Sequence, residues 1–97
     1  MRVRYTLPAL ADLDTILDYI AERSPQGARN VHARIHAVLE LLQTYPYIGT
    51  PTRDLSIRRM TTTPYPYLIF YEVAGEDLIV HAVRHGARDP SSMPEAE

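Results

Sequence analysis

The pattern of hydrophobic and polar positions changes twice along this chain. Apolar and polar residues alternate over residues 2–6, which predicts a short first strand. Apolar residues then recur at three- and four-residue intervals, which predicts an amphipathic helix from Pro8 to about Arg23. Leu7 stands where the helix cap is expected, and Leu is a poor cap, so the start of this helix is weakly marked.

A second helix is predicted directly after the first. Ser24 and Pro25 mark its start, because a Ser side chain caps helical N–H groups and Pro suits the first helical position. Its apolar stripe continues to about Gln43. Two helices with so short a connection fold back as an antiparallel hairpin. Residues 45–51, with their Tyr, Pro and Gly residues, are expected to form a turn-rich connector.

Beyond the connector the spacing is that of strands. We expect strands at 57–60, 67–73 and 78–84, with the loop of a hairpin at 74–77. Strict alternation divides the last strand between two faces: Ile79, His81, Val83 and His85 on one, Leu78, Val80, Ala82 and Arg84 on the other. The order β-α-α-β-β-β predicts an α+β fold, with a helical hairpin packed on one face of a mainly antiparallel sheet.

Length and composition describe one globular domain, expected at residues 1–90, with a mobile polar tail at 91–97. The chain has no cysteine, which excludes disulfides, thiolate metal sites and a cysteine nucleophile. His32 and His36 have the spacing of a helical metal pair, but no carboxylate or third ligand accompanies them, so we predict no metal and no cofactor. No apolar run is long enough to cross a membrane and no signal peptide is recognisable, which favours the cytoplasm.

The charge of the chain argues against a general nucleic-acid binder. All ten basic residues are Arg, the formal net charge is −2 and the pI is near 6.0. Proteins that hold long stretches of nucleic-acid backbone are usually strongly basic. Tyr65, Tyr67 and Tyr71 share one face of the predicted middle strand, where core packing is a better interpretation than base stacking.

Arginines and a histidine gather where the predicted strands come together: Arg58, Arg59, Arg84, His85 and Arg88. Such a cluster suits phosphodiester cleavage, because the cations stabilise developing charge and the imidazole transfers a proton. The guanidinium groups also suit a partner rich in carboxylates. A third interpretation is a solvated strand end, with Arg84 or Arg88 paired to Asp89. The apolar stripes of the helices are wide, and an edge of the predicted sheet is open. We therefore also predict a docking surface for a peptide partner.

Four segments, in this order, resemble the ParE/RelE toxin superfamily. They are Ala11-Asp12-Leu13-xx-Ile16-xx-Tyr19-Ile20, Tyr45-Pro46-xx-Gly49-xx-Arg53, Tyr67-xx-Phe70-Tyr71 and Val83-Arg84-His85-xx-Arg88-Asp89-Pro90. The resemblance implies a toxin of a type II toxin–antitoxin pair, also called a plasmid stabilisation protein. A ParD-like or other antitoxin would silence it, and DNA would be reached only indirectly, through the antitoxin complex. RelE-type members cut mRNA in the ribosome, whereas ParE-type members inhibit DNA gyrase.

Within this resemblance we assign expected roles to residues. For antitoxin contact we predict the outward rims of the first helix, near Leu10, Leu17 and Tyr19, together with Arg58. For contact with the target we predict Arg59, Arg84, His85 and Arg88, and a nuclease would use Arg59, Arg84 and His85. The absence of lysine, the low pI and the absence of a tyrosine after Arg84 favour the ParE-type branch, so we expect gyrase inhibition rather than catalysis.

Overall fold

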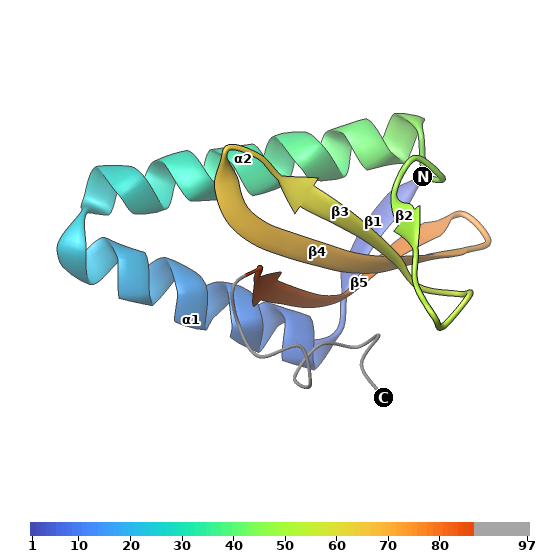
Figure 1. Ribbon diagram of the computed structural model, residues 1–97, viewed down its shortest axis with the longest axis horizontal. Helices are drawn as coiled ribbons and strands as arrows, with labels where there is room; N and C mark the ends of the chain where they lie inside the picture. The colour runs from blue at the N-terminus through green and yellow to red at the C-terminus, as the bar shows by residue number, and fades with distance from the viewer. Residues whose placement is uncertain (87–97) are drawn as a thin grey trace.

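The computed structural model describes residues 1–86. This part of the chain forms two helices and five strands (Figure 1): β1 (Arg2–Tyr5), α1 (Leu7–Arg23), α2 (Pro25–Thr44), β2 (Thr50–Pro51), β3 (Arg58–Thr62), β4 (Tyr65–Ala74) and β5 (Asp77–His85). The predicted tail at 91–97 and the end of the predicted domain at 87–90 lie outside the described residues.

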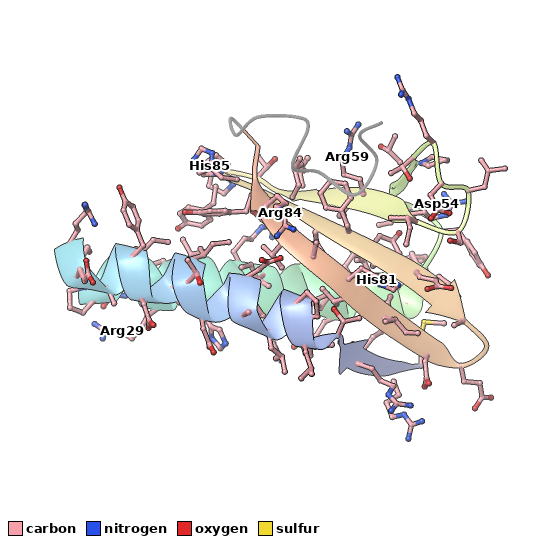
Figure 2. All side chains as sticks on the ribbon, turned by 90° about the horizontal axis from the view of Figure 1, so that it is seen from below. Arg29, Asp54, Arg59, His81, Arg84 and His85 are labelled. Atoms are coloured by element: carbon pink, nitrogen blue, oxygen red, sulfur yellow. The ribbon has the colours of Figure 1, made fainter. Side chains whose placement is uncertain are left out.

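The strands form a single sheet in the order β1-β5-β4-β3-β2. β1 runs parallel to β5, and the other neighbouring strands are antiparallel. Both helices lie on the same side of the sheet, which is clearest in Figure 2. The predicted α+β fold is therefore confirmed. β2 was not predicted: it lies in the connector, where Thr50 and Pro51 pair with Arg59 and Arg58.

Each helix begins at a capping hydroxyl. Thr6 Oγ1 accepts a hydrogen bond from the backbone N–H of Ala9 at 3.2 Å, and Ser24 Oγ accepts one from Gly27 at 2.9 Å. The start of α2 is as predicted. The expectation that Leu7 occupies the cap of α1 is wrong. The N–H groups in the first turn of a helix have no acceptor within the helix, so Pro8, which has no N–H, can lie in that turn. The helix therefore begins at Leu7 and Thr6 is its cap.

The main hydrophobic core lies between the helices and the sheet. Its buried side chains come from both helices, β4 and β5: Ala9, Val31, Ile35, Val38, Leu39, Leu42, Tyr67, Ile69, Tyr71, Leu78, Val80 and Val83. α1 adds half-buried residues to it: Leu13, Ile16, Leu17 and Ile20. Tyr65, Tyr67 and Tyr71 pack here, as predicted for the face they share.

The other side of the sheet, which we call the outer face, carries a small second cluster formed by Ile57, Phe70 and Ala82, with Leu68 packed against it. A β-bulge in β5 changes which residues reach this face. Phe70 pairs with Ala82 but Tyr71 pairs with Val80, so His81 is an extra residue in β5.

The predicted alternation of β5 is wrong from the bulge onward. Val83 packs in the main core with Leu78 and Val80, whereas Ala82 turns to the outer face. The hydrophobic pattern alone could not reveal this, because residues on both sides of the bulge are apolar.

Candidate functional site

α1 and its cap cover the part of β5 that β1 leaves unpaired. β1 pairs with residues 77–80 only. Beyond them, the Thr6 hydroxyl donates to the carbonyl of His81 at 3.2 Å, and the N–H of Val83 donates to Asp12 Oδ2 at 3.0 Å. The same carboxylate oxygen pairs with the guanidinium of Arg84. Side chains of the helix thus satisfy backbone groups that a free strand edge would expose.

Asp12 holds the edge of β5, a structural role that the sequence analysis, which treated it only as part of the first helix, did not predict. Its role depends on where α1 crosses the sheet, which no local pattern records. One interpretation of the sequence paired Arg84 or Arg88 with Asp89, whereas in the described residues Arg84 pairs with Asp12 of α1. Asp89, the partner considered from the sequence, lies outside the described residues.

Arg59 and Arg84 both belong to the outer face. Arg59 stands opposite Phe70 and Arg84 opposite Leu68, so the two arginines flank β4 from β3 and β5. In Figure 2 the guanidinium of Arg84 turns back toward α1, whereas Arg59 points away from the helices. The sheet therefore brings these two predicted residues to one face, with their charged ends directed differently.

His85 belongs to the opposite face of the sheet. It pairs with Tyr67, a core residue, and the two rings meet edge to face with centroids 5.4 Å apart. Adjacent residues of a strand point to opposite faces, so His85 and Arg84 diverge. Arg88, also predicted for the target surface, lies outside the described residues.

A histidine–carboxylate pair also occupies the outer face. His81 Nε2 lies 2.7 Å from Glu72 Oε1, and both side chains are about one-third exposed. Asp54, in the loop before β3, accepts hydrogen bonds from the hydroxyl and N–H of Ser56, which hold the pKa of its carboxyl below the ordinary value. A weaker attraction to His81 acts in the same direction. Positive and negative side chains therefore surround the small apolar cluster of the outer face.

Two side chains hold the connector against the sheet. The buried Tyr71 hydroxyl donates to the carbonyl of Pro46 at 2.7 Å and accepts from the N–H of Gly49 at 3.0 Å, and burial raises the pKa of this phenol. Arg58 donates to the carbonyls of Tyr47 and Gly49, at 3.0 and 2.8 Å. Arg58, predicted for antitoxin contact, is therefore engaged within the chain.

Glycine is required at position 49 for a steric reason. A Cβ built on Gly49 would lie 2.5 Å from the Tyr71 hydroxyl and 3.0 Å from the carbonyl of Arg59. The glycine of the Tyr-Pro-xx-Gly segment thus allows the connector to approach β3 and β4 closely. The sequence shows that a glycine occurs at this position. It does not show that Tyr71, 22 residues away, lies against it.

The rim of α1 exposes part of the surface predicted for antitoxin contact. Leu10 is 44% exposed and Tyr19 58%, with the guanidinium carbon of Arg23 lying 3.9 Å from the centre of the Tyr19 ring. Leu17, also predicted for this contact, packs against the main core and is half-buried, so it exposes a smaller fraction of its surface than Leu10 or Tyr19. Leu7, which was not predicted as a contact, is 81% exposed at the start of the same helix.

Among residues 1–86, no group of three or more His, Asp or Glu side chains is placed to hold a metal ion. No helix in that range is long and apolar enough to cross a membrane.

Comparison with known proteins identifies the family of this chain. The family model of the ParE toxin of the type II toxin–antitoxin system parDE matches residues 3–90. Together with the fold, the match defines the chain as a toxin of a type II toxin–antitoxin system. More specifically, it belongs to the ParE toxin family, within the ParE/RelE group that the sequence segments resemble.

Individual relatives cover nearly the whole chain. Y4kP of Sinorhizobium fredii, a toxin by name, is 38% identical over 84 residues, which are 87% of this chain and 86% of the relative. Toxin RelE2 of Caulobacter vibrioides is 39% identical over 89 residues, 90% of this chain and 97% of the relative. A solved structure of the chromosomal ParDE TA system from P. aeruginosa matches with a TM-score of 0.76 at 24% identity, over 88% of this chain and 95% of that chain. This last likeness shows the shared fold.

Proposed function

We propose that this toxin inhibits DNA gyrase in the cytoplasm of its host. The observation that carries the proposal is the divergence of Arg84 and His85, which point to opposite faces of β5 while Asp12 engages Arg84. A cation and a proton-transfer group that act on one phosphodiester have to converge on it. This arrangement favours a surface that binds a protein target over a nuclease centre. The membership of the ParE family supports the same choice.

We further propose that a ParD-like antitoxin neutralises the toxin by covering the rim of α1. Leu7, Leu10 and Tyr19 are large apolar side chains exposed on this helix, with Leu10 and Tyr19 on opposite flanks, so a partner that wraps around the helix would bury them. The chain would meet DNA only through the antitoxin, since its own net charge is −2. Stabilisation of a plasmid or chromosomal segment would follow from the pair, not from the toxin alone.

Ribosome-dependent cleavage of mRNA is the second candidate function. It is favoured by one observation, the 39% identity to a relative named Toxin RelE2. In that case Arg59 and Arg84 would supply the cations and His85 the proton transfer, after a rearrangement that brings the imidazole to the outer face.

The two functions are separated by testing the purified chain on both targets. We expect it to block supercoiling by DNA gyrase and to leave mRNA intact in a translating extract. Arg59→Ala is expected to weaken gyrase inhibition by tenfold or more, because Arg59 points outward from the face that carries the charged cluster. Arg29→Ala, which removes an exposed arginine from α2 and leaves the outer face unchanged, is the matched control and should inhibit like the parent chain.

In cells, induction of the toxin alone should arrest DNA synthesis before protein synthesis. Immediate translation arrest with cleaved mRNA, and with unaffected gyrase in the purified assay, would instead establish the nuclease. Loss of that cleavage in both Arg84→Ala and His85→Ala would then identify its catalytic residues.

The antitoxin surface is tested by binding measurements with the ParD-like antitoxin that neutralises this chain. Leu10→Glu and Tyr19→Ala are expected to weaken binding by tenfold or more, because both remove exposed apolar surface from the α1 rim. Arg58→Ala is measured together with thermal unfolding, since Arg58 also holds the connector. Binding that survives both rim substitutions would contradict the assignment of this surface.

A further inference from the structure

We propose that α2 carries a binding site for a divalent transition-metal ion, formed by the imidazoles of His32 and His36 with Glu40 as the group that orients the second ring. This site lies on the helix away from the sheet and is independent of the proposed action on gyrase.

Helix geometry places the two imidazoles side by side. Residues four apart in a helix lie on one face, with Cβ atoms about 5–6 Å apart, within reach of a single bound ion. His32 and His36 both lie inside α2, far from its ends, and both are exposed. Imidazole nitrogen is a preferred ligand of zinc, copper and nickel ions.

Glu40 supplies a carboxylate beside this histidine pair, which the sequence analysis did not find. Its Oε1 lies 3.0 Å from Nδ1 of His36, which places the ring hydrogen on Nδ1 and leaves the lone pair of Nε2 for a metal. Carboxylates that hold the far nitrogen of a ligating histidine fix the ring and raise its basicity. The sequence showed no third direct ligand, whereas the structure shows a carboxylate in this supporting position.

The surroundings leave the pair accessible. His32 makes no hydrogen bond or ion pair within the described residues, and the nearest cations on α2 are turned elsewhere. Arg29 donates to Gln26 at 2.7 Å, and Arg34 donates to the carbonyl of Thr63 at 2.8 Å. Since residues 1–86 contain no three-residue metal group, water completes the coordination of this two-histidine site.

Isothermal titration calorimetry tests the site. The tag-free full-length chain is titrated with copper(II) chloride in a non-chelating buffer. Copper is the probe because it binds nitrogen ligands most tightly of the divalent first-row ions. We expect one equivalent to bind with the highest affinity. His32→Ala and His36→Ala should each weaken this step by tenfold or more, and Glu40→Gln by about tenfold.

The chain also offers a control with an unchanged number of histidines. The double variant His36→Ala with Ala37→His moves one imidazole to a spacing of five, which takes it off the shared face. This variant is expected to bind as weakly as His36→Ala. If it binds like the parent chain, or if both single histidine variants keep the parent affinity, the site does not exist. Circular dichroism of each variant checks that α2 is retained, because the substituted side chains are exposed.

Discussion

The two faces of the sheet differ in how much apolar surface they bury. Toward the helices, twelve buried side chains of residues 1–86 form one continuous cluster. On the outer face the cluster has three buried members, Ile57, Phe70 and Ala82. Charged groups lie around that smaller cluster, from β3, β4 and β5: Arg59, Glu72, His81 and Arg84.

This difference concentrates the stability of the domain on one face of the sheet. Burial of apolar surface is the largest favourable contribution to folding, so most of the stability of this domain depends on the helix-covered face. Substitution of an exposed charged residue on the outer face changes the free energy of folding only slightly. Relatives of one fold can therefore differ in target while keeping the same core.

The largest effect is expected from a cavity in the helix-covered face. Leu42 is fully buried, and Leu42→Ala should lower the free energy of unfolding by about 2–5 kcal/mol. Leu55→Ala removes the same atoms from a side chain that is 86% exposed, so it should change stability by less than about 0.5 kcal/mol. Urea denaturation of both variants measures the contrast. Equal losses would mean that the core does not lie where the structure places it.

A smaller loss is expected where the connector meets the edge of that core. Gly49→Ala should cost about 1–3 kcal/mol, because the added methyl group collides with the Tyr71 hydroxyl and the Arg59 carbonyl. Tyr71→Phe removes one of these obstacles, so the cost of Gly49→Ala should be smaller in that background. A double-mutant cycle by urea denaturation tests the coupling. Strictly additive losses would rule out this contact as the cause.

The next effect concerns the junction of the two faces at β5. Asp12→Ala removes the acceptor of the Val83 N–H and the partner of Arg84, and should cost about 1–2 kcal/mol. Hydrogen exchange at the Val83 amide should accelerate in the same variant. Asp14→Ala, two positions along α1 and exposed, is the matched control and should leave that amide unchanged. Unaltered exchange in Asp12→Ala would contradict the proposed sealing of the strand edge.

The smallest effect is expected at β1. Hydrogen bonds from Arg2, with a further contribution from Arg4, hold the pKa of the Asp77 carboxyl below its ordinary value of 3.8. A carboxyl with a lower pKa in the folded chain stabilises the fold above its unfolded value, and this contribution is lost as the pH falls through the folded value. The urea midpoint should therefore drop slightly less in Asp77→Asn than in the parent chain between pH about 6 and about 3. An identical drop in both would exclude this contribution.

Sequence reasoning reached the elements whose signals are local. The helical stripes, the Ser24 cap and the alternation of β4 each depend on residues close together in the chain, and each is found as predicted. The cap of α1 was misplaced by one residue because a proline in the first turn allows two starting points.

The candidate site was harder to predict because its geometry depends on register. A single extra residue at His81 moves Val83 into the core and Ala82 out of it. The contact of Asp12 with Arg84 joins residues 72 positions apart, and the clamp of Tyr71 on Gly49 joins residues 22 apart. Such contacts produce no periodic pattern in the sequence. Residue types therefore indicated which charged side chains to consider, but not which face of the sheet each one occupies.

The parallel pairing of β1 with β5 has a consequence for the biogenesis of a toxin. Within the described residues β1 pairs in the sheet only with residues 77–80, so β1 cannot take its place in the sheet before β5 has been synthesised. Contacts this distant in sequence close late in folding. A growing chain, or one cut anywhere before β5, lacks the strand that joins β1 and α1 to the rest of the sheet. The five-stranded sheet of the toxin fold therefore forms only after the residues of β5 have been synthesised.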